Sequence, residues 1–481
     1  MSISLKRPRQ QRRAWLARPR PGALRQWAET LPLDRPEQAL DAINRRLRSL
    51  NFTAMGARRR LQCLAPLQRP VRHLNRSLAE SMVNERMPAH PDLAHRLVQL
   101  SETWARLSVG YLCAVDQMGR REGRLAREAT LRALQSLGRL LLARSQVYAP
   151  PPAGTWQAIH YCRSALHGDM RPVAPGEDGD AADTDTAYKQ LLILGGIGPH
   201  RLRPSEQVAL YQVLANWAQQ VSVRPLRGAK PKAPPLVFRP GEDEAPRLYP
   251  QDHAPDSPGL RMIDPAPLAG RARHRLSLLE AGQHGARLSG APLEADTLRA
   301  LLNAWSASPS RRFPRAEKNQ NGEMVLGLET CWRAIAGHDG MAMNCRVTNQ
   351  SAGGIQATIH APIPQTIAVG EVLAIRQDGE WRPGVVRWLR QPDPDSILLG
   401  IETVARRARA LELALDGHGV RIPALLLEEN RAAESPSTLL TPRCPIHEHT
   451  TITTVEGDSL QVGRCLERTA GYSRYRIGGN A

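Results

Sequence analysis

The spacing of apolar residues changes once along this chain of 481 residues, and that change constrains the fold more than any other feature. Between residues 36 and 217, apolar side chains recur every three or four positions, which places them on one side of a helix. From Met324 onward they fall into short extended runs divided by turn dipeptides. We therefore expect an α+β multidomain protein in which an all-helical domain precedes a β-rich part.

The helical pattern is clearest in the segment that begins at Pro36. Asp34 is a candidate cap for this helix, and Pro36 suits its first turn. Similar periodicity runs through residues 93–115, 131–147 and 204–221. The apolar face of the first helix consists of Ala39, Leu40, Ile43, Leu47 and Leu50.

Six short extended runs in the β-rich part predict a six-stranded antiparallel barrel. They cover residues 324–328, 343–347, 354–360, 372–376, 384–389 and 397–401. Their expected turns are Asn321-Gly322, Asp339-Gly340, Asp378-Gly379 and residues 392–395. After the barrel we expect a short helix over 406–415 and strands over 420–427 and 459–466.

Changes in composition divide the chain into five parts. Ten prolines between 227 and 267 argue against regular helix there, although Leu236–Phe238 could form an edge strand. The expected parts are a basic, disordered tail (1–35), a helical domain (36–226), a Pro-rich linker (227–292), a helix plus barrel (293–415) and a small β-rich extension (416–481).

The formal net charge of +19 raises the prospect of a polyanionic partner. Only five of the 65 basic residues are lysines, and such arginine richness also follows from codon bias in a GC-rich genome. The basic amino terminus, in which Trp15 and Trp27 stand among arginines, keeps nucleic acid as an alternative partner.

The sequence contains neither a signal-peptide core nor a transmembrane segment of about 18 to 20 apolar residues. Its seven cysteines are an odd number scattered over a long chain, so we expect reduced thiols that are mostly buried. These features predict a cytoplasmic protein.

Two short motifs flank the first predicted strands of the barrel. Arg311-Arg312-Phe313-Pro314-Arg315 places two arginines four positions apart in a segment that its proline keeps from being helical. Asn349-Gln350-Ser351-Ala352-Gly353-Gly354 follows at a turn between two strands. In this order and at this separation, the two motifs resemble the RxxxR and [D/N]xSxxG motifs of the PilZ domain family.

Later strands support the resemblance, which covers about residues 311–415. Trp381 and the run Gly384 to Trp388 are similar to the family's VRW-type strand, and Leu399 to Glu402 to its glycine-hydrophobic strand. The resemblance implies a receptor for cyclic di-GMP that acts in motility, pili, exopolysaccharide or biofilm control. It also implies that a residue near RxxxR, here Arg312, influences whether one ligand or a stacked pair binds.

The chemistry of the motif residues suits such a ligand. Cyclic di-GMP is a dianion with two guanines, and a guanidinium fork matches both phosphate oxygens and the O6/N7 edge of guanine. Asn and Ser at a turn offer short hydrogen-bonding groups, and glycines permit close backbone approach. The predicted ligand-binding residues are Arg311, Arg312, Arg315, Asn349, Ser351, Gly353 and Gly354.

Other signals are weaker. LLILGGIG at 191–198 lacks the spacing of a phosphate-binding loop and predicts a helix end and a turn. His338-Asp339 is isolated, and Cys444, His447, His449 and Cys465 lack the spacing of a structural zinc site. No GGDEF-like or EAL-like motif is present, so we expect neither an enzyme nor a metal or cofactor site.

Three functions remain open at this point. The first is a cyclic di-GMP receptor whose helical domain contacts an unidentified protein partner. The second is an adaptor that keeps the PilZ fold without the ligand. The third is a basic regulator that binds nucleic acid.

Overall fold

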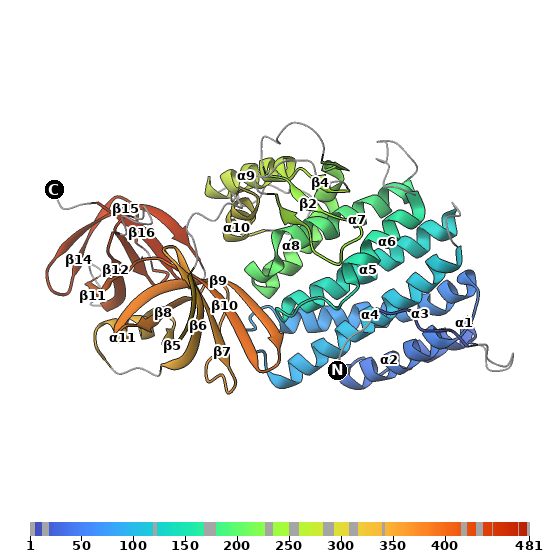
Figure 1. The fold of residues 1–481 in the computed structure, drawn as a ribbon. Helices are drawn as coiled ribbons and strands as arrows, with labels where there is room; N and C mark the ends of the chain where they lie inside the picture. The colour runs from blue at the N-terminus through green and yellow to red at the C-terminus, as the bar shows by residue number, and fades with distance from the viewer. Residues whose placement is uncertain are drawn as a thin grey trace. The chain divides into compact units, whose positions relative to one another are not determined.

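The computed structural model divides the chain into two compact units. The first comprises Met1–Glu85 and Ala89–Ser310, and the second comprises Arg86–Pro88 and Arg311–Ala481. The structure describes residues 5–11, 19–118, 123–167, 179–226, 234–249, 259–281, 293–306, 316–338, 342–414, 421–429, 436–444, 446–469 and 471–478. Figure 1 shows helices in the first unit and strands throughout the second.

Helix α4 (Pro91–Met118) forms the centre of the helical part, where it packs against α2, α3 and α5. Its long run of buried residues includes Leu97, Leu107 and Tyr111, which leaves little of the helix facing solvent. The predicted all-helical domain is confirmed. Its helices are α1 (Pro21–Glu29), α2 (Pro36–Phe52), α3 (Ala57–Ser81), α4, α5 (Arg124–Gln146), α6 (Thr155–His167), α7 (Gly179–Ile197) and α8 (Pro204–Trp217), with 3-10 turns η2 (Pro199–Arg201) and η3 (Ala218–Gln220).

Two local predictions in this unit have different outcomes. Helix α2 begins at Pro36 as expected, but its capping position is Arg35 and not Asp34, without a side-chain cap bond. The LLILGGIG segment contains the end of α7 at Ile197, and its last residue, Gly198, has φ of 71°, as a helix end and turn require.

The prediction of a disordered tail over 1–35 is wrong for the residues that the structure describes there. Leu5 is buried, and Gln11 pairs with the α2–α3 connection through hydrogen bonds to Phe52 O (2.8 Å) and from Ala54 N (2.9 Å). The Arg7 guanidinium contacts Asp116 and lies 4.8 Å from the ring centroid of Tyr161. The positive charge of Arg7 is therefore already paired within the protein.

The segment 227–292, expected to be a linker, contains folded elements. Its strands β2 (Leu236–Phe238), β3 (Arg247–Leu248) and β4 (Arg261–Ile263) form a sheet with β1 (Val223–Pro225), which precedes the segment, in the order β1-β4-β2-β3. Strand β2 is interior and not an edge, because it pairs with β3 on one side and with β4 on the other, and all three of its side chains are buried. Helices α9 (Ala266–Glu280) and α10 (Ala295–Ser306) follow.

The first β-barrel of the second unit has the six predicted antiparallel strands, closed in the order β10-β7-β6-β5-β8-β9 (Figure 1). Asp378 and Gly379 form the expected turn, with φ of 53° and 82°. Asn321-Gly322 is not a turn, because it lies within β5. The strands are β5 (Ala316–Leu326), β6 (Met343–Ser351), β7 (Gly354–His360), β8 (Val372–Gln377), β9 (Glu380–Asp393) and β10 (Ser396–Thr403).

The carboxy-terminal extension is a second closed barrel, in the order β11-β12-β13-β16-β15-β14. The helix predicted over 406–415 is wrong, because this segment is strand β11. Leu411 and Leu413 alternate into the barrel core, and pairing with β12 outweighs the helical propensity of Ala, Leu and Glu. The strands are β11 (Ala408–Ala414), β12 (Arg421–Leu427), β13 (Thr438–Thr441), β14 (Thr450–Thr454), β15 (Ser459–Arg468) and β16 (Ser473–Ile477).

The two barrels share one hydrophobic core, which we call the shared core. Helix α11 (Leu328–Ile335), which the sequence did not predict, supplies Cys331 and packs against both barrels. The indole N–H of Trp332 donates to Leu411 O at 2.8 Å. The fully buried members of the shared core are Val325, Cys331, Ala374, Val385, Ala405, Leu425, Leu427, Leu440 and Tyr472.

Three residues from the connection between α3 and α4 complete the second unit. Met87 and Ile367 exchange backbone hydrogen bonds of 2.8 and 2.6 Å, and Met87 is 2% exposed. Arg86 donates to both carboxylate oxygens of Glu371, at 2.5 and 2.6 Å. The second unit therefore includes a short piece of chain from far earlier in the sequence.

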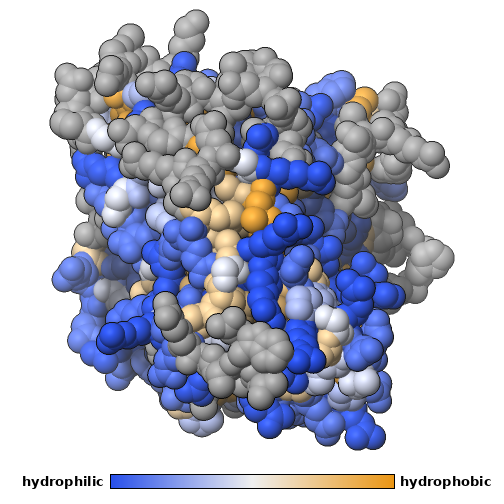
Figure 2. All heavy atoms as spheres, turned by 90° about the vertical axis from the view of Figure 1, so that its right-hand side faces the viewer, coloured by the Kyte–Doolittle hydropathy of each residue, from blue (hydrophilic) through white to orange (hydrophobic). Residues whose placement is uncertain are grey.

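Figure 2 shows one face of the molecule, where hydrophilic residues surround a smaller apolar area. All seven cysteines are free thiols and five are buried, as predicted. Within the described parts of the chain, no helix combines the length and hydropathy that a membrane span needs.

Candidate ligand-binding face of the first barrel

A β-bulge in β6 sets the direction of the turn-motif side chains. Met343, Cys345 and Val347 alternate into the barrel, and an unbroken alternation would send Asn349 and Ser351 inward as well. The register shifts between Val347 and Asn349, so the extra residue reverses the alternation. Asn349 lies opposite Gln356, whose neighbours in β7 are buried, so both side chains stand on the outside of the barrel.

The end of β6 and the start of β7 hold the remaining turn residues. Ser351 pairs with Gly354, and the Ser351 hydroxyl donates to Gly354 O at 3.3 Å. Gly353 O accepts from Thr403 N at 3.3 Å. A Cβ on Gly354 would lie 2.6 Å from the carbonyl oxygen of Ile401, so only glycine fits without a shift of backbone.

Gln356 is a neighbour of the motif that the sequence analysis missed. The Asn349 amide donates to the Gln356 side-chain oxygen at 2.9 Å, and the Thr348 hydroxyl donates to the Gln356 backbone oxygen at 3.2 Å. Only the strand register could have revealed it, because no short motif links positions 349 and 356. Both amides can reorient toward a ligand, since each offers donors and acceptors.

The arginine motif lies outside the described residues, so Arg311, Arg312 and Arg315 have no described geometry. Strand β5 nevertheless begins at Ala316, the residue that follows Arg315 in the sequence. Ala316 is opposite Gln350, and Glu317 is opposite Asn349. The arginine motif is thus joined covalently to the strand end that lies beside the turn motif.

Two carboxylates hold the guanidinium of Arg387 in β9. Its guanidinium donates to Glu402 at 2.5 Å and to both oxygens of Glu467, at 2.6 and 3.1 Å. Burial opposes its charge, but the hydrogen bond to Glu467 and the charge of Glu402 leave the pKa of Arg387 raised. Arg387 therefore joins the two barrels and remains charged, which makes it a structural group.

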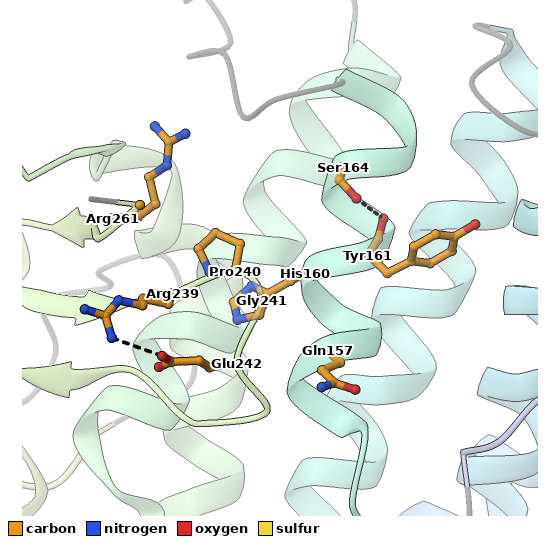
Figure 3. Close-up of a pocket in the computed structure, with 10 residues that line it drawn as sticks. Gln157, His160, Tyr161, Ser164, Arg239, Pro240, Gly241, Glu242 and Arg261 are labelled. Atoms are coloured by element: carbon orange, nitrogen blue, oxygen red, sulfur yellow. Dashed lines mark hydrogen bonds and ion pairs between the residues drawn. The ribbon is translucent and has the colours of Figure 1, made fainter. Parts of the chain in front are cut away.

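A hollow of about 640 Å³ in the first unit lies between α6 and the β2–β4 sheet. Figure 3 shows that the Arg239 and Arg261 side chains extend away from α6, with Arg239 bonded to Glu242 at 3.1 Å. His160 is buried there, and burial lowers its pKa to about 4, so it is neutral at pH 7. The residues that line this hollow therefore do not form a cluster of cations that could bind an anion.

Comparison with known proteins supports the division into helical, first-barrel and second-barrel parts. Residues 22–227 match the family described as the amino-terminal domain of the cyclic-di-GMP receptor FimW. Residues 335–410 match its middle PilZ domain, and residues 410–478 match its carboxy-terminal beta-barrel domain. The chain is therefore a PilZ-domain protein, and the resemblance predicted from its motifs is confirmed.

A curated relative shares this arrangement over most of both chains. The chain is 24% identical, over 530 aligned residues, to the cyclic-di-GMP receptor FimW of Pseudomonas aeruginosa. The alignment covers 89% of this chain and 85% of the relative. The PilZ match at 335–410 includes Asn349, Ser351, Gly353 and Gly354 and begins after the arginine motif, so the roles of all the predicted site residues stay predictions.

Proposed function

We propose that this protein is a receptor for cyclic di-GMP that binds the dinucleotide on the outer face of its PilZ barrel. The turn residues Asn349, Ser351, Gly353 and Gly354 would form one side of the site, and Arg311, Arg312 and Arg315 the other. The observation that carries the proposal is the pairing of Ala316 with Gln350, which anchors the end of the arginine motif beside the turn.

The chemistry of the two sides is complementary. The turn side has uncharged amide and hydroxyl groups, which suit guanine edges but leave the two phosphates without countercharge. Arginines supply that charge and bind phosphate or guanine through two parallel hydrogen bonds. In the bound state, the arginine side chains would therefore contact the ligand on the barrel face.

The helical domain is the proposed output region of a cytoplasmic, non-enzymatic regulator. The curated relative is named as a receptor, which supports a binding function. We propose that ligand binding controls how the helical domain contacts a protein partner, with motility, pili, exopolysaccharide or biofilm as the affected process.

Calorimetric titration of the purified full chain with cyclic di-GMP tests the proposal, with cyclic di-AMP and GTP as control ligands. Arg311→Ala, Arg315→Ala and Ser351→Ala should each weaken binding. Loss of one charge-assisted contact should cost about 1.5 to 3 kcal/mol, or roughly ten- to a hundredfold in affinity. Arg333→Ala, on the exposed face of α11, is the matched control and should leave binding unchanged.

Failure of folded wild-type protein to bind cyclic di-GMP would refute the receptor proposal. The adaptor hypothesis would then take first place, because the fold would persist without the ligand. Equal binding of cyclic di-AMP would refute the assigned role of guanine recognition.

A further inference from the structure

The exposed side of α3 carries a row of arginines. Positions 58, 62, 65, 69, 72 and 76 are all exposed, and their alternating spacing of four and three residues places them on one side of the helix. At a rise of 1.5 Å per residue, the row is about 27 Å long. Its members, which we call the α3 row, are Arg58, Gln62, Ala65, Arg69, Arg72 and Arg76.

The α3 row has no countercharge among the residues that the structure describes. None of its four arginines forms a salt bridge with a described residue, and Arg72 donates instead to the side-chain oxygen of Gln68 at 3.2 Å. Glu80, beyond the end of the row, is the only acidic residue of α3. Because like charges three or four positions apart destabilise a helix, carboxylates from outside would relieve the repulsion within the row.

The other two arginines of α3 have partners inside the fold. Arg60 is 1% exposed and donates to Leu50 O at 3.1 Å and to Thr53 O at 2.8 Å. Arg59 donates to Pro19 O at 3.2 and 3.0 Å. These two arginines join α3 to neighbouring segments, whereas the arginines of the α3 row face solvent and are available to a partner.

A hollow of about 500 Å³ opens at the amino-terminal end of the α3 row. Arg58 and Gln62 of the row line it, together with Pro21 of α1 and Gly56. A partner that lies along the row can therefore place a side chain in this hollow beside Arg58.

We propose that the α3 row binds an acidic helix of a protein partner, in which carboxylates recur every three or four residues. This inference rests on the proposed function for the existence of a protein partner, and it adds the binding surface and the chemistry of that partner. A guanidinium binds a carboxylate through two parallel hydrogen bonds. A helix aligned with α3 would present its carboxylates at the same intervals as the arginines of the row.

The composition of α3 favours this partner over a membrane or a single-stranded nucleic acid. A helix in a membrane surface inserts apolar side chains, but none of the large apolar side chains exposed in the described parts of the chain belongs to α3. Single-stranded nucleic acids stack their bases on aromatic rings, and α3 contains no Phe, Tyr or Trp. Duplex DNA needs only cations for its phosphates, so the experiment below includes it.

The α3 row is also close to the PilZ barrel along the chain. Helix α3 ends at Ser81, and residues 82–85 lead to Arg86–Pro88, which belong to the second unit. Helix α4 begins at Pro91, on the other side of these residues, and is mostly buried. Helix α3 therefore offers the exposed helical surface that is nearest in the chain to this contact with the barrel.

Fluorescence anisotropy of a labelled acidic peptide tests the proposal with the full chain. The probe is an Ala-rich helical peptide of about 20 residues, long enough to match the row, with Glu three and four positions apart. In the control peptide, Gln replaces every Glu, and it should not bind. Arg69→Ala/Arg72→Ala should weaken binding of the Glu peptide on the order of three- to thirtyfold, because two ion pairs are lost. Arg58→Ala/Arg76→Ala, a second pair from the same row, should weaken it similarly.

Arg124→Ala/Arg273→Ala is the matched control. It also removes two exposed helical arginines from the first unit, but from α5 and α9. Its affinity for the Glu peptide should equal that of the wild type, although its net charge is the same as that of Arg69→Ala/Arg72→Ala. Melting temperatures recorded for every variant separate lost binding from lost folding.

The outcomes separate this inference from the proposed function. Equal affinities of Arg69→Ala/Arg72→Ala and the matched control would overturn the α3 row as a specific surface. Tighter binding of duplex DNA or of phosphatidylglycerol vesicles, dependent on the same two arginines and at the same salt concentration, would overturn the acidic helix as its partner. Wild-type protein that binds cyclic di-GMP but not the Glu peptide would refute this inference alone, and the reverse result would refute the receptor proposal alone.

Discussion

Replacement of Leu427 by alanine should destabilise both barrels of the second unit together. Leu427 belongs to β12 of the second barrel, and its side chain is fully buried in the shared core. A buried Leu→Ala change costs about 2 to 5 kcal/mol through lost apolar burial and the cavity left behind. Because the shared core also includes Val385 and Ala374 of the first barrel, the same loss should reach both.

Native-state hydrogen exchange measures this coupling strand by strand. A loss of about 3 kcal/mol corresponds to a roughly 150-fold faster exchange of amides that open by unfolding of the whole unit. We expect this acceleration in β8 and β9 as well as in β11–β16. Leu97→Ala is the matched control, because it makes the same side-chain change in the core of the first unit. It should leave amide exchange in the strands of the second unit unchanged. Faster exchange confined to β11–β16 after Leu427→Ala would refute the shared core as a cooperative unit.

Three further changes test other contacts. His160 stacks on Phe238 and has a pKa lowered by burial to about 4, so the unfolded chain binds its proton more readily than the folded one. The free energy of unfolding should therefore fall by about 3 kcal/mol as pH drops from 7 to 4, measured by urea titration, and His160→Phe should remove most of this dependence. Burial acts to raise the pKa of Glu467, but the hydrogen bond to Arg387 and the positive charge of Arg387 lower it. The stabilisation from Glu467 should be present above pH 4.5 and lost as pH falls through the lowered pKa. If the urea midpoint of Glu467→Gln depends on pH in the same way as that of the wild-type protein, this expectation is contradicted. Gly354→Ala should cost about 1 to 3 kcal/mol in denaturant unfolding, because its Cβ would meet the Ile401 carbonyl, and unchanged stability would contradict that geometry.

Hydrophobic periodicity was sufficient to predict the type of most elements. The alternating segment 354–360 became β7 with the same bounds, and Pro36 opened α2. These segments satisfy their local preferences and their tertiary contacts at once. Their prediction therefore needed no knowledge of partners.

The wrong predictions occur where distant partners outweigh local preference. Residues 408–414 have helix-forming side chains, yet pairing with β12 makes them a strand. The prolines of 227–292 suggested a linker, yet Leu236–Phe238 is buried between two neighbouring strands. In the candidate site, the motif identified Asn349 but not Gln356 or the bulge at Thr348, because both depend on which residues of β6 and β7 lie opposite each other.

The contact of Met87 with Ile367 also sets an order of events during synthesis. Arg86 and its partner Thr366 are 280 positions apart, so the ribosome must add all the residues between them before the contact can form. At about 5 to 20 residues per second, this delay is on the order of 14 to 56 seconds. The helices on either side of residues 86–88 therefore have time to fold first. When the β7–β8 connection is synthesised, its contact partners at residues 86–88 are already present. A fragment that starts at residue 311 would lack residues 86–88, and a separate peptide that contains Arg86–Pro88 should restore the contacts with Ile367 and Glu371.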